Sequence, residues 1–181
     1  MPRAATVVVD MFNPYDHEDG DALAEQARSR IEPLRTLIAA TRDAEDVELV
    51  YVNDNFDDFS GTSDDIVRAA LEGRHPELVE PIKPSEGSLF VEKVRHSAFY
   101  ESSLNHLLHV KGVETVVLAG QVTEQCILYT ALDAYIRGFQ LRIARDCVIP
   151  IDDELGQAAL RMMESNMSAD LLDATDCFPE G

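Results

Sequence analysis

Short apolar runs rich in β-branched residues recur along this chain and alternate with segments of helical periodicity. The strand-like runs cover residues 6–9, 48–52, 89–93, 115–119 and 141–144. The helical segments cover residues 22–41, 63–72, 103–110, 127–137 and 154–167, with Asp21 as the predicted N-cap of the first and Pro33 as a kink or break inside it. This alternation is typical of a parallel sheet covered by helices on both faces.

The length and composition favour one well-buried domain over residues 1–181. The chain has 181 residues, of which 45% are hydrophobic, and no internal repeat is visible. We expect disorder only in the first few residues and in residues 178–181.

The charge of the chain limits its partners. The formal net charge of −19 disfavours nucleic acid and anionic membranes, so we expect a small-molecule partner. We attribute the acidity to solubility or to a salt-rich or high-GC source. No apolar run is long enough to span a bilayer, and the N-terminus carries no signal pattern. The three cysteines form no CxxC pair and no zinc-type spacing, which predicts a reduced, cytoplasmic protein.

Polar residues whose side chains are suited to binding or catalysis follow several of the predicted strands. Binding sites of parallel sheets form at the carboxyl ends of the strands. This rule selects Asp10, residues 53–55, Lys93 and the loop 120–126, which come from distant parts of the chain. We expect the fold to bring them to one edge of the sheet.

Cys126 lies where an apolar strand turns through a short polar loop into a helix. A thiol in the first helical turn experiences the positive end of the helix macrodipole, which favours the nucleophilic thiolate. The alternative is a buried, inert cysteine, the common fate of this residue type. We interpret Cys147 and Cys177 in that second way, because neither has comparable surroundings.

Asp10 and Lys93 complete a reactive group with Cys126. Asp10 follows three valines, and a buried acid there acts either as a general base or as a cap of the next turn. Strand alternation places Lys93 on the face of Val91, where it is able to pair with Asp10, although most lysines are solvated. Asp10 accepts the thiol proton, Lys93 offsets the negative charge, and the N–H groups of Val122 and Cys126 form an oxyanion hole. These roles predict acyl transfer to sulfur followed by hydrolysis.

The same segments resemble the isochorismatase-like cysteine hydrolases over nearly the whole chain. The resemblance is carried by the strand that ends at Asp10, by the Lys93 segment and by residues 119–138. Its most specific part is the Thr123-x-x-Cys126 loop followed by Thr130-Ala131-x-Asp133-Ala134.

This resemblance implies a three-layer α/β/α sandwich with a central, mostly parallel sheet of Rossmann-like topology. It also implies a catalytic triad of Asp10, Lys93 and Cys126, a cis peptide between Gln121 and Val122, no cofactor, and a homo-oligomer (dimer or tetramer). Most members of the family hydrolyse amide, carbamoyl or ureido C–N bonds. Vinyl-ether hydrolases of the family often lack the cysteine, so Cys126 favours the C–N branch.

The metal site of the related nicotinamidases is not expected here. Those enzymes use an Asp-x-His pair after the second strand, whereas this chain has Asp54, Asn55 and Phe56 there. No histidine lies between His17 and His75. The chain therefore resembles a poorly characterised subgroup without a metal.

Residues beside the triad on the same loops are candidates for substrate binding. They are Phe12, Asn55, Phe56, His96, Phe99 and Tyr129. For each one, ordinary packing is the alternative. The helix with Tyr129, Leu132 and Ile136 is either a contact surface between subunits or packed on the sheet.

Two further functions remain open on the sequence. One is a catalytically idle relative that binds a metabolite or serves in assembly, and the other is a vinyl-ether hydrolase. A flavodoxin-like or nucleotide-binding protein is disfavoured, because the chain has neither a GxxxxGK nor a GxGxxG loop.

Overall fold

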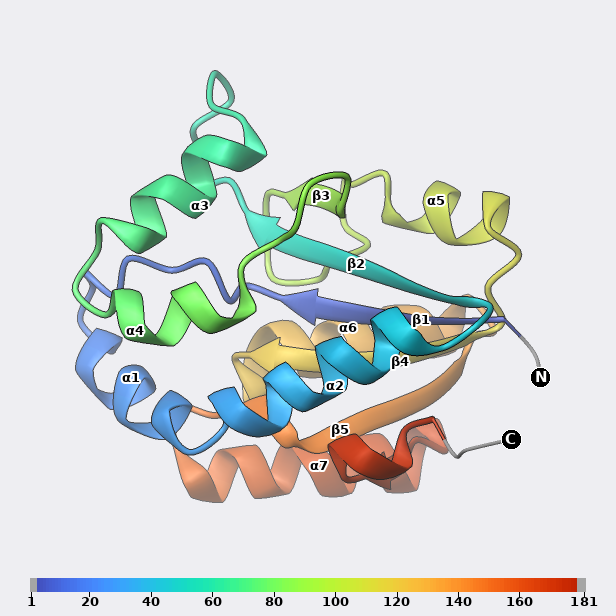
Figure 1. Ribbon diagram of the computed structural model, residues 1–181. Coiled ribbons are helices and arrows are strands. Elements are labelled where there is room, and N and C mark those ends of the chain that lie inside the picture. The colour runs from blue at the N-terminus through green and yellow to red at the C-terminus, as the bar shows by residue number, and fades with distance from the viewer. Residues whose placement is uncertain (1–2, 179–181) are drawn as a thin grey trace.

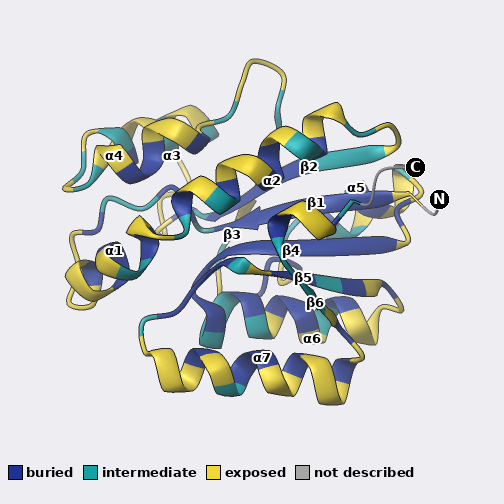
Figure 2. Cartoon of the chain, turned by 60° about the horizontal axis from the view of Figure 1, so that its bottom comes forward, coloured by how far each residue is buried: buried dark blue, intermediate teal, exposed yellow. Residues whose placement is uncertain are grey.

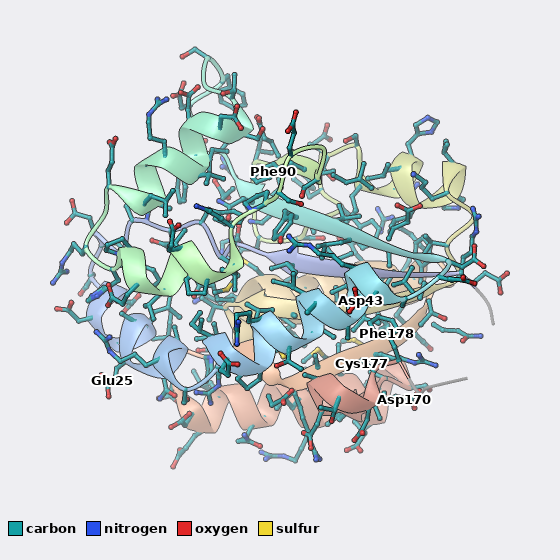
Figure 3. All side chains as sticks on the ribbon, viewed as in Figure 1. Glu25, Asp43, Phe90, Asp170, Cys177 and Phe178 are labelled. Atoms are coloured by element: carbon teal, nitrogen blue, oxygen red, sulfur yellow. The ribbon has the colours of Figure 1, made fainter. Side chains whose placement is uncertain are left out.

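The computed structural model describes residues 3–178. The disorder expected at the two ends falls mostly outside this range. Phe178 is an exception, since it is partly buried against the core (labelled in Figure 3).

The described part of the chain forms a six-stranded parallel sheet, as the alternating pattern predicted (Figure 1). The strand order is β3-β2-β1-β4-β5-β6, so the chain changes direction across the sheet between β1 and β4. The strands are β1 (Ala4–Val9), β2 (Val47–Asp54), β3 (Leu89–Lys93), β4 (Thr115–Gln121), β5 (Gln140–Ile149) and β6 (Asp170–Leu172). Sites in such sheets form where the strand order reverses, which here is the carboxyl end of β1 and β4.

Helices cover both faces of the sheet and complete the predicted three-layer sandwich (Figure 2). The α-helices are α1 (Gly20–Arg28), α2 (Ile31–Asp43), α3 (Ser63–Leu71), α4 (Pro76–Val79), α5 (Leu104–Val110), α6 (Leu128–Ile136) and α7 (Asp153–Met167). Shorter helices are η1 (Glu80–Ile82), the π-helix η2 (Thr123–Ile127) and η3 (Ala174–Asp176).

Two hydrophobic clusters lie on opposite faces of the sheet. In β1, Val7 and Val9 pack with α5, α6 and α7, whereas Val8 packs with α1, α2 and α4. This follows from the two-residue period of a strand, because successive side chains point to opposite faces. Both faces are apolar, which explains why the inner strands are continuous hydrophobic runs.

The predicted helix over residues 22–41 is in fact two helices, α1 and α2. They are separated at Ser29 and Arg30, and Pro33 lies in the first turn of α2, where a missing N–H costs no helical hydrogen bond. The N-cap of α1 is Asp19 rather than Asp21. The short elements α4 and β6 were not predicted, since each has too few residues for a periodic signal.

Candidate active site

The fold brings Asp10, Asp54, Lys93 and Cys126 together at one edge of the sheet. Asp10 follows β1, Asp54 ends β2, Lys93 ends β3, and η2 with Cys126 follows β4. These four strands are neighbours, and their carboxyl ends point the same way (Figure 1). The sequence-based expectation of a shared edge is therefore met.

Lys93 is the centre of the cluster. Its side chain is 1% exposed, on the face of Val91 as strand alternation predicted, while Glu92 is exposed. The Nζ atom lies 2.9 Å from Asp10 Oδ2 and 3.3 Å from Asp54 Oδ2. It also donates a 2.8 Å hydrogen bond to the Arg95 carbonyl and lies 3.9 Å from Cys126 Sγ. A buried ammonium is stable here because carboxylates surround it.

Asp10 is held by the backbone of two neighbouring strands. Its own N–H donates to the Val52 carbonyl, and its Oδ1 accepts a 2.8 Å bond from the N–H of Asp54. The Gln121 side chain donates a 2.7 Å bond to the Asp10 carbonyl. Asp10 has a φ of 52°, a region that aspartate tolerates better than most residues. These contacts hold the carboxylate beside the Lys93 ammonium.

Cys126 lies in the π-helix η2, at the start of the helical segment that continues as α6. It is partly buried, and its Sγ atom lies 3.9 Å from the Lys93 ammonium, which also pairs with Asp10. Val122 directly precedes η2, and its N–H acts to lower the pKa of the Cys126 thiol. The peptide between Gln121 and Val122 is cis. The ends of β1, β3 and β4 thus meet around the Cys126 sulfur.

The electrostatics of the cluster differ from the sequence-based expectation of a thiolate. Burial, reinforced by the Asp10 carboxylate, raises the pKa of Cys126 to about 12, although Lys93 and the Val122 N–H oppose this. Burial also raises the pKa of Asp10 in spite of Lys93. Burial lowers the pKa of Lys93, but Asp10, Cys126 and Asp54 outweigh it and raise the pKa overall. The resting site therefore holds a neutral thiol beside an ion pair.

Alkylation of Cys126 by iodoacetamide tests this protonation state. We expect the rate at pH 7 to be lower than that of a free thiol and to keep rising up to a pH of about 12, because only the thiolate reacts. Peptide mass spectrometry after timed labelling from pH 6 to 10 measures it, with glutathione as the reference thiol. A plateau below pH 8 contradicts the neutral resting thiol.

Thr130 and Asp133, which follow the Thr123-x-x-Cys126 loop in the family motif, anchor the loop after β3. Ser97 donates a 2.5 Å hydrogen bond to Asp133 Oδ2, and the N–H of Ala98 donates a 2.9 Å bond to Thr130 Oγ1. Asp133 and Thr130 lie on α6, directly after the turn with Cys126. The spacing of this motif therefore couples the Cys126 helix to the loop that follows Lys93.

Three of the six substrate-binding candidates are packed inside the protein. Phe12 is buried in the hydrophobic cluster on one face of the sheet, whereas Cys126 packs against the cluster on the other face. The Phe12 ring stacks on Phe90 (labelled in Figure 3). Phe99 is buried against Phe139. Asn55 is buried, and its N–H donates a 3.0 Å bond to the Lys93 carbonyl. For Phe12 and Phe99, these contacts agree with ordinary packing, which was the alternative to substrate binding.

The other three candidates are exposed on the loops and helix beside the cluster. Phe56 lies two residues after Asp54, and its ring is exposed. The rings of His96 and Tyr129 lie 5.6 Å apart, which connects the loop after β3 with α6. These three residues remain candidates for contact with a substrate.

Three polar residues at this edge have roles that the sequence-based assignment missed. Asp54 pairs with Lys93, and Gln121 holds the Asp10 backbone. Glu124 Oε1 accepts 3.0 Å bonds from the N–H groups of Ile151 and Asp152, which ties η2 to the loop before α7. Asp54 was within the selected strand end, but only the tertiary structure reveals its partner.

Within residues 3–178, no group of at least three His, Cys, Asp or Glu side chains is arranged to hold a metal ion. Nor does this described range include a helix with the length and apolar character required to cross a membrane.

The fold and the cluster together define a three-layer α/β protein with an Asp–Lys–Cys group at the carboxyl edge of a parallel sheet. The chain belongs to the isochorismatase family: the family described as "Isochorismatase domain" matches residues 4–176.

Similarity to individual proteins agrees with this family. The chain is 30% identical to the uncharacterized isochorismatase family protein YaaI of Bacillus subtilis, over 92% of each chain. A shorter stretch, 38% of this chain and 32% of the relative, is 45% identical to maleamate amidohydrolase of Pseudomonas putida. Among solved structures, N-carbamoylsarcosine amidase of Thermoplasma acidophilum is 29% identical, with a TM-score of 0.74 over 99% of each chain.

Proposed function

We propose that this protein is a cysteine-dependent hydrolase that cleaves an amide, carbamoyl or ureido C–N bond of a small molecule. The observation that carries the proposal is the position of the Lys93 ammonium, which lies 2.9 Å from the Asp10 carboxylate and 3.9 Å from the Cys126 sulfur. A nucleophile, a base within reach and a group that orients the base are the parts that covalent catalysis needs. The amidohydrolase and the amidase among the similar proteins support the same bond type.

In the first step, Asp10 removes the thiol proton while the sulfur attacks the substrate carbonyl carbon. The raised pKa of Asp10 makes it a stronger base than an exposed aspartate. Lys93 stays protonated and offsets the negative charge that passes from Asp10 to the sulfur. The C–N bond then breaks, and the proton held by Asp10 goes to the departing nitrogen. An acyl or carbamoyl group is left on Cys126.

In the second step, water hydrolyses this thioester-type intermediate. Asp10, again ionised, takes a proton from the water as the water oxygen attacks the carbonyl carbon. The carbon–sulfur bond breaks and the thiolate recovers the proton, which restores the neutral thiol. The sum of both steps consumes one water and releases an amine or ammonia with an acid.

The N–H groups of Val122 and Cys126 are the proposed oxyanion hole. The effect of the Val122 N–H on the Cys126 thiol, whose pKa it acts to lower, supports this role because it places a donor near the reacting atom. In the tetrahedral intermediate, such donors stabilise the charge on the former carbonyl oxygen.

A direct test combines substrate screening with trapping of the intermediate. Purified protein is incubated with small amides, carbamoyl amines and ureido compounds, and ammonia release is measured. Intact-protein mass spectrometry after acid quenching then detects the acyl adduct, and peptide mapping assigns it to Cys126. Turnover without any adduct on Cys126, under conditions in which deacylation is slow, would count against the covalent mechanism.

Replacing Asp10 by asparagine is expected to lower kcat by about 10²–10⁴-fold, because asparagine has a similar shape but is unable to accept the thiol proton. The double variant with Cys126→Ala should be no less active than Cys126→Ala alone, since the residues act as one unit. Steady-state kinetics and circular dichroism measure both effects. Asp58→Asn, an identical change at an exposed position, is the control.

We also propose that this protein, a single domain, forms a homo-oligomer. Tyr129, Leu132 and Ile136 on α6 are exposed in the chain, so packing on the sheet does not account for them. An exposed row of large apolar side chains on an acidic protein is typical of a contact surface.

A further inference from the structure

Asp54 carries a negative charge in the active site that the proposed chemistry does not use. Its Oδ2 lies 3.3 Å from Lys93 Nζ, and its Oδ1 accepts a 2.8 Å bond from the N–H of Phe56. Its side chain is 29% exposed, compared with 14% for Asp10 and 1% for Lys93. Of the two carboxylates that pair with Lys93, Asp54 is therefore the more accessible to an incoming molecule.

Lys93 has all of its hydrogen-bond donors occupied. An ammonium carries three N–H groups. Nζ donates to Asp54 Oδ2, the Arg95 carbonyl and Cys126 Sγ, at 3.3, 2.8 and 3.9 Å, and also pairs with Asp10 Oδ2 at 2.9 Å. A substrate carboxylate has to displace one of these partners to reach the ammonium. With two carboxylates and one ammonium, the cluster already carries a net charge of −1 while the thiol is neutral.

The surrounding loops offer little compensating positive charge. The loops after β1 to β5 cover residues 10–19, 55–62, 94–103, 122–127 and 150–152, and each contains at least one acid. Arg95 is their only Lys or Arg. Its guanidinium donates to the Val94 carbonyl and lies 3.5 Å from Asp57 Oδ1. The one arginine in these loops is thus already paired with an acid.

We infer that the site selects neutral or cationic amide or ureido compounds over those that carry a carboxylate, and that Asp54 determines this specificity. The inference rests on the proposed function and names its substrate class. A neutral substrate brings N–H groups that are able to donate to the exposed edge of Asp54. An anionic substrate instead meets uncompensated negative charge in a partly buried place, where screening is weak.

Matched pairs of compounds that differ only by carboxylate or carboxamide test the inference. Suitable pairs are maleamate with maleamide, and N-carbamoylsarcosine with its carboxamide. We expect kcat/KM for ammonia release to be about tenfold or more higher for the neutral member of each pair. Asp54→Asn removes the charge but keeps an acceptor for Lys93, and should reduce this ratio several-fold.

Two control variants separate Asp54 from its surroundings. Asp58→Asn removes the same charge from an exposed position in the loop that follows Asp54 and should leave the ratio unchanged. Arg95→Gln should not weaken turnover of the carboxylates. If it does, Arg95 binds them and the inference is overturned. A ratio that Asp54→Asn leaves unaltered also overturns the role of Asp54.

Calorimetric binding of the same pairs to Cys126→Ala separates this inference from the proposed hydrolysis. Binding of the neutral members alone, with no turnover of any compound by the native protein, supports the specificity and rejects the hydrolase function. Tighter binding of the carboxylates overturns the specificity even if they are hydrolysed. Failure of every compound to bind overturns it as well.

Discussion

Replacing Cys126 by alanine is expected to lower kcat by about four orders of magnitude or more and to leave the fold intact. The sulfur is the atom that forms the proposed intermediate, and neither Asp10 nor Lys93 is able to substitute for it. Cys126 is only partly buried, so the free energy of unfolding should fall by about 1 kcal/mol or less. Activity is lost for a chemical reason and not through unfolding.

Cys177→Ala is the matched control for this variant. Cys177, which is labelled in Figure 3, directly follows η3. Its thiol is buried and donates to the Asp173 carbonyl at 3.4 Å. This variant should keep its kcat while it loses some stability, because a buried sulfur is removed. Steady-state kinetics and urea unfolding of both variants give the comparison. A Cys126→Ala protein with more than about 1% of native kcat contradicts covalent catalysis.

Lys93→Met is expected to have the largest effect on stability. Methionine fills a similar volume but leaves the carboxylates of Asp10 and Asp54 without their cation in a buried site. Breaking a buried ion pair in this way costs about 3–5 kcal/mol of unfolding free energy. Activity should fall by orders of magnitude too, because Lys93 no longer offsets the charge on the sulfur.

The loss of stability in Lys93→Met should depend on pH. Burial raises the pKa of Asp10 in the folded protein even with Lys93 present, and removal of Lys93 raises it further. A raised carboxyl pKa favours the fold at low pH, and this contribution disappears as the pH rises through the folded pKa. The deficit relative to the native protein should therefore be larger at pH 7.5 than near pH 4.5.

Urea unfolding at both pH values measures this difference. Lys83→Met is the control, since Lys83 is half-exposed and pairs with Glu80 on the surface, where ion pairs contribute little. Adding Asp54→Asn to Lys93→Met should restore part of the stability, because one unpaired carboxylate is removed. A deficit of equal size at both pH values contradicts the charge-based explanation.

The sequence predicted the members of the cluster better than their electrostatics. Asp10, Lys93 and Cys126 were identified because each lies at or just after the end of an apolar strand, and parallel strands place such ends together. The pKa of Cys126 was expected to be lowered by the helix terminus. Burial and the nearby Asp10 reverse that direction, and neither is visible in local sequence.

The substrate-binding candidates illustrate the same limit. Phe12 and Phe99 are close to triad segments in sequence, yet their rings pack into hydrophobic clusters on opposite faces of the sheet. Short loops reverse direction within a few residues, so sequence distance from a strand end does not decide where a side chain points. Asp54 and Gln121, which do contact the triad, carry no local signal that separates them from neighbouring polar residues.

The sequence by itself determined the layered α/β architecture, the edge of the sheet where the site lies and the residues with reactive side chains. These follow from strand and helix periodicity, which is local and repeated. The tertiary structure alone decided that two carboxylates and the Arg95 carbonyl surround the Lys93 ammonium, that the Cys126 thiol is neutral, and that Asp54 leaves a net negative charge beside it. Burial and charge pairing depend on segments dozens of residues apart, and only packing brings those segments within a few ångströms.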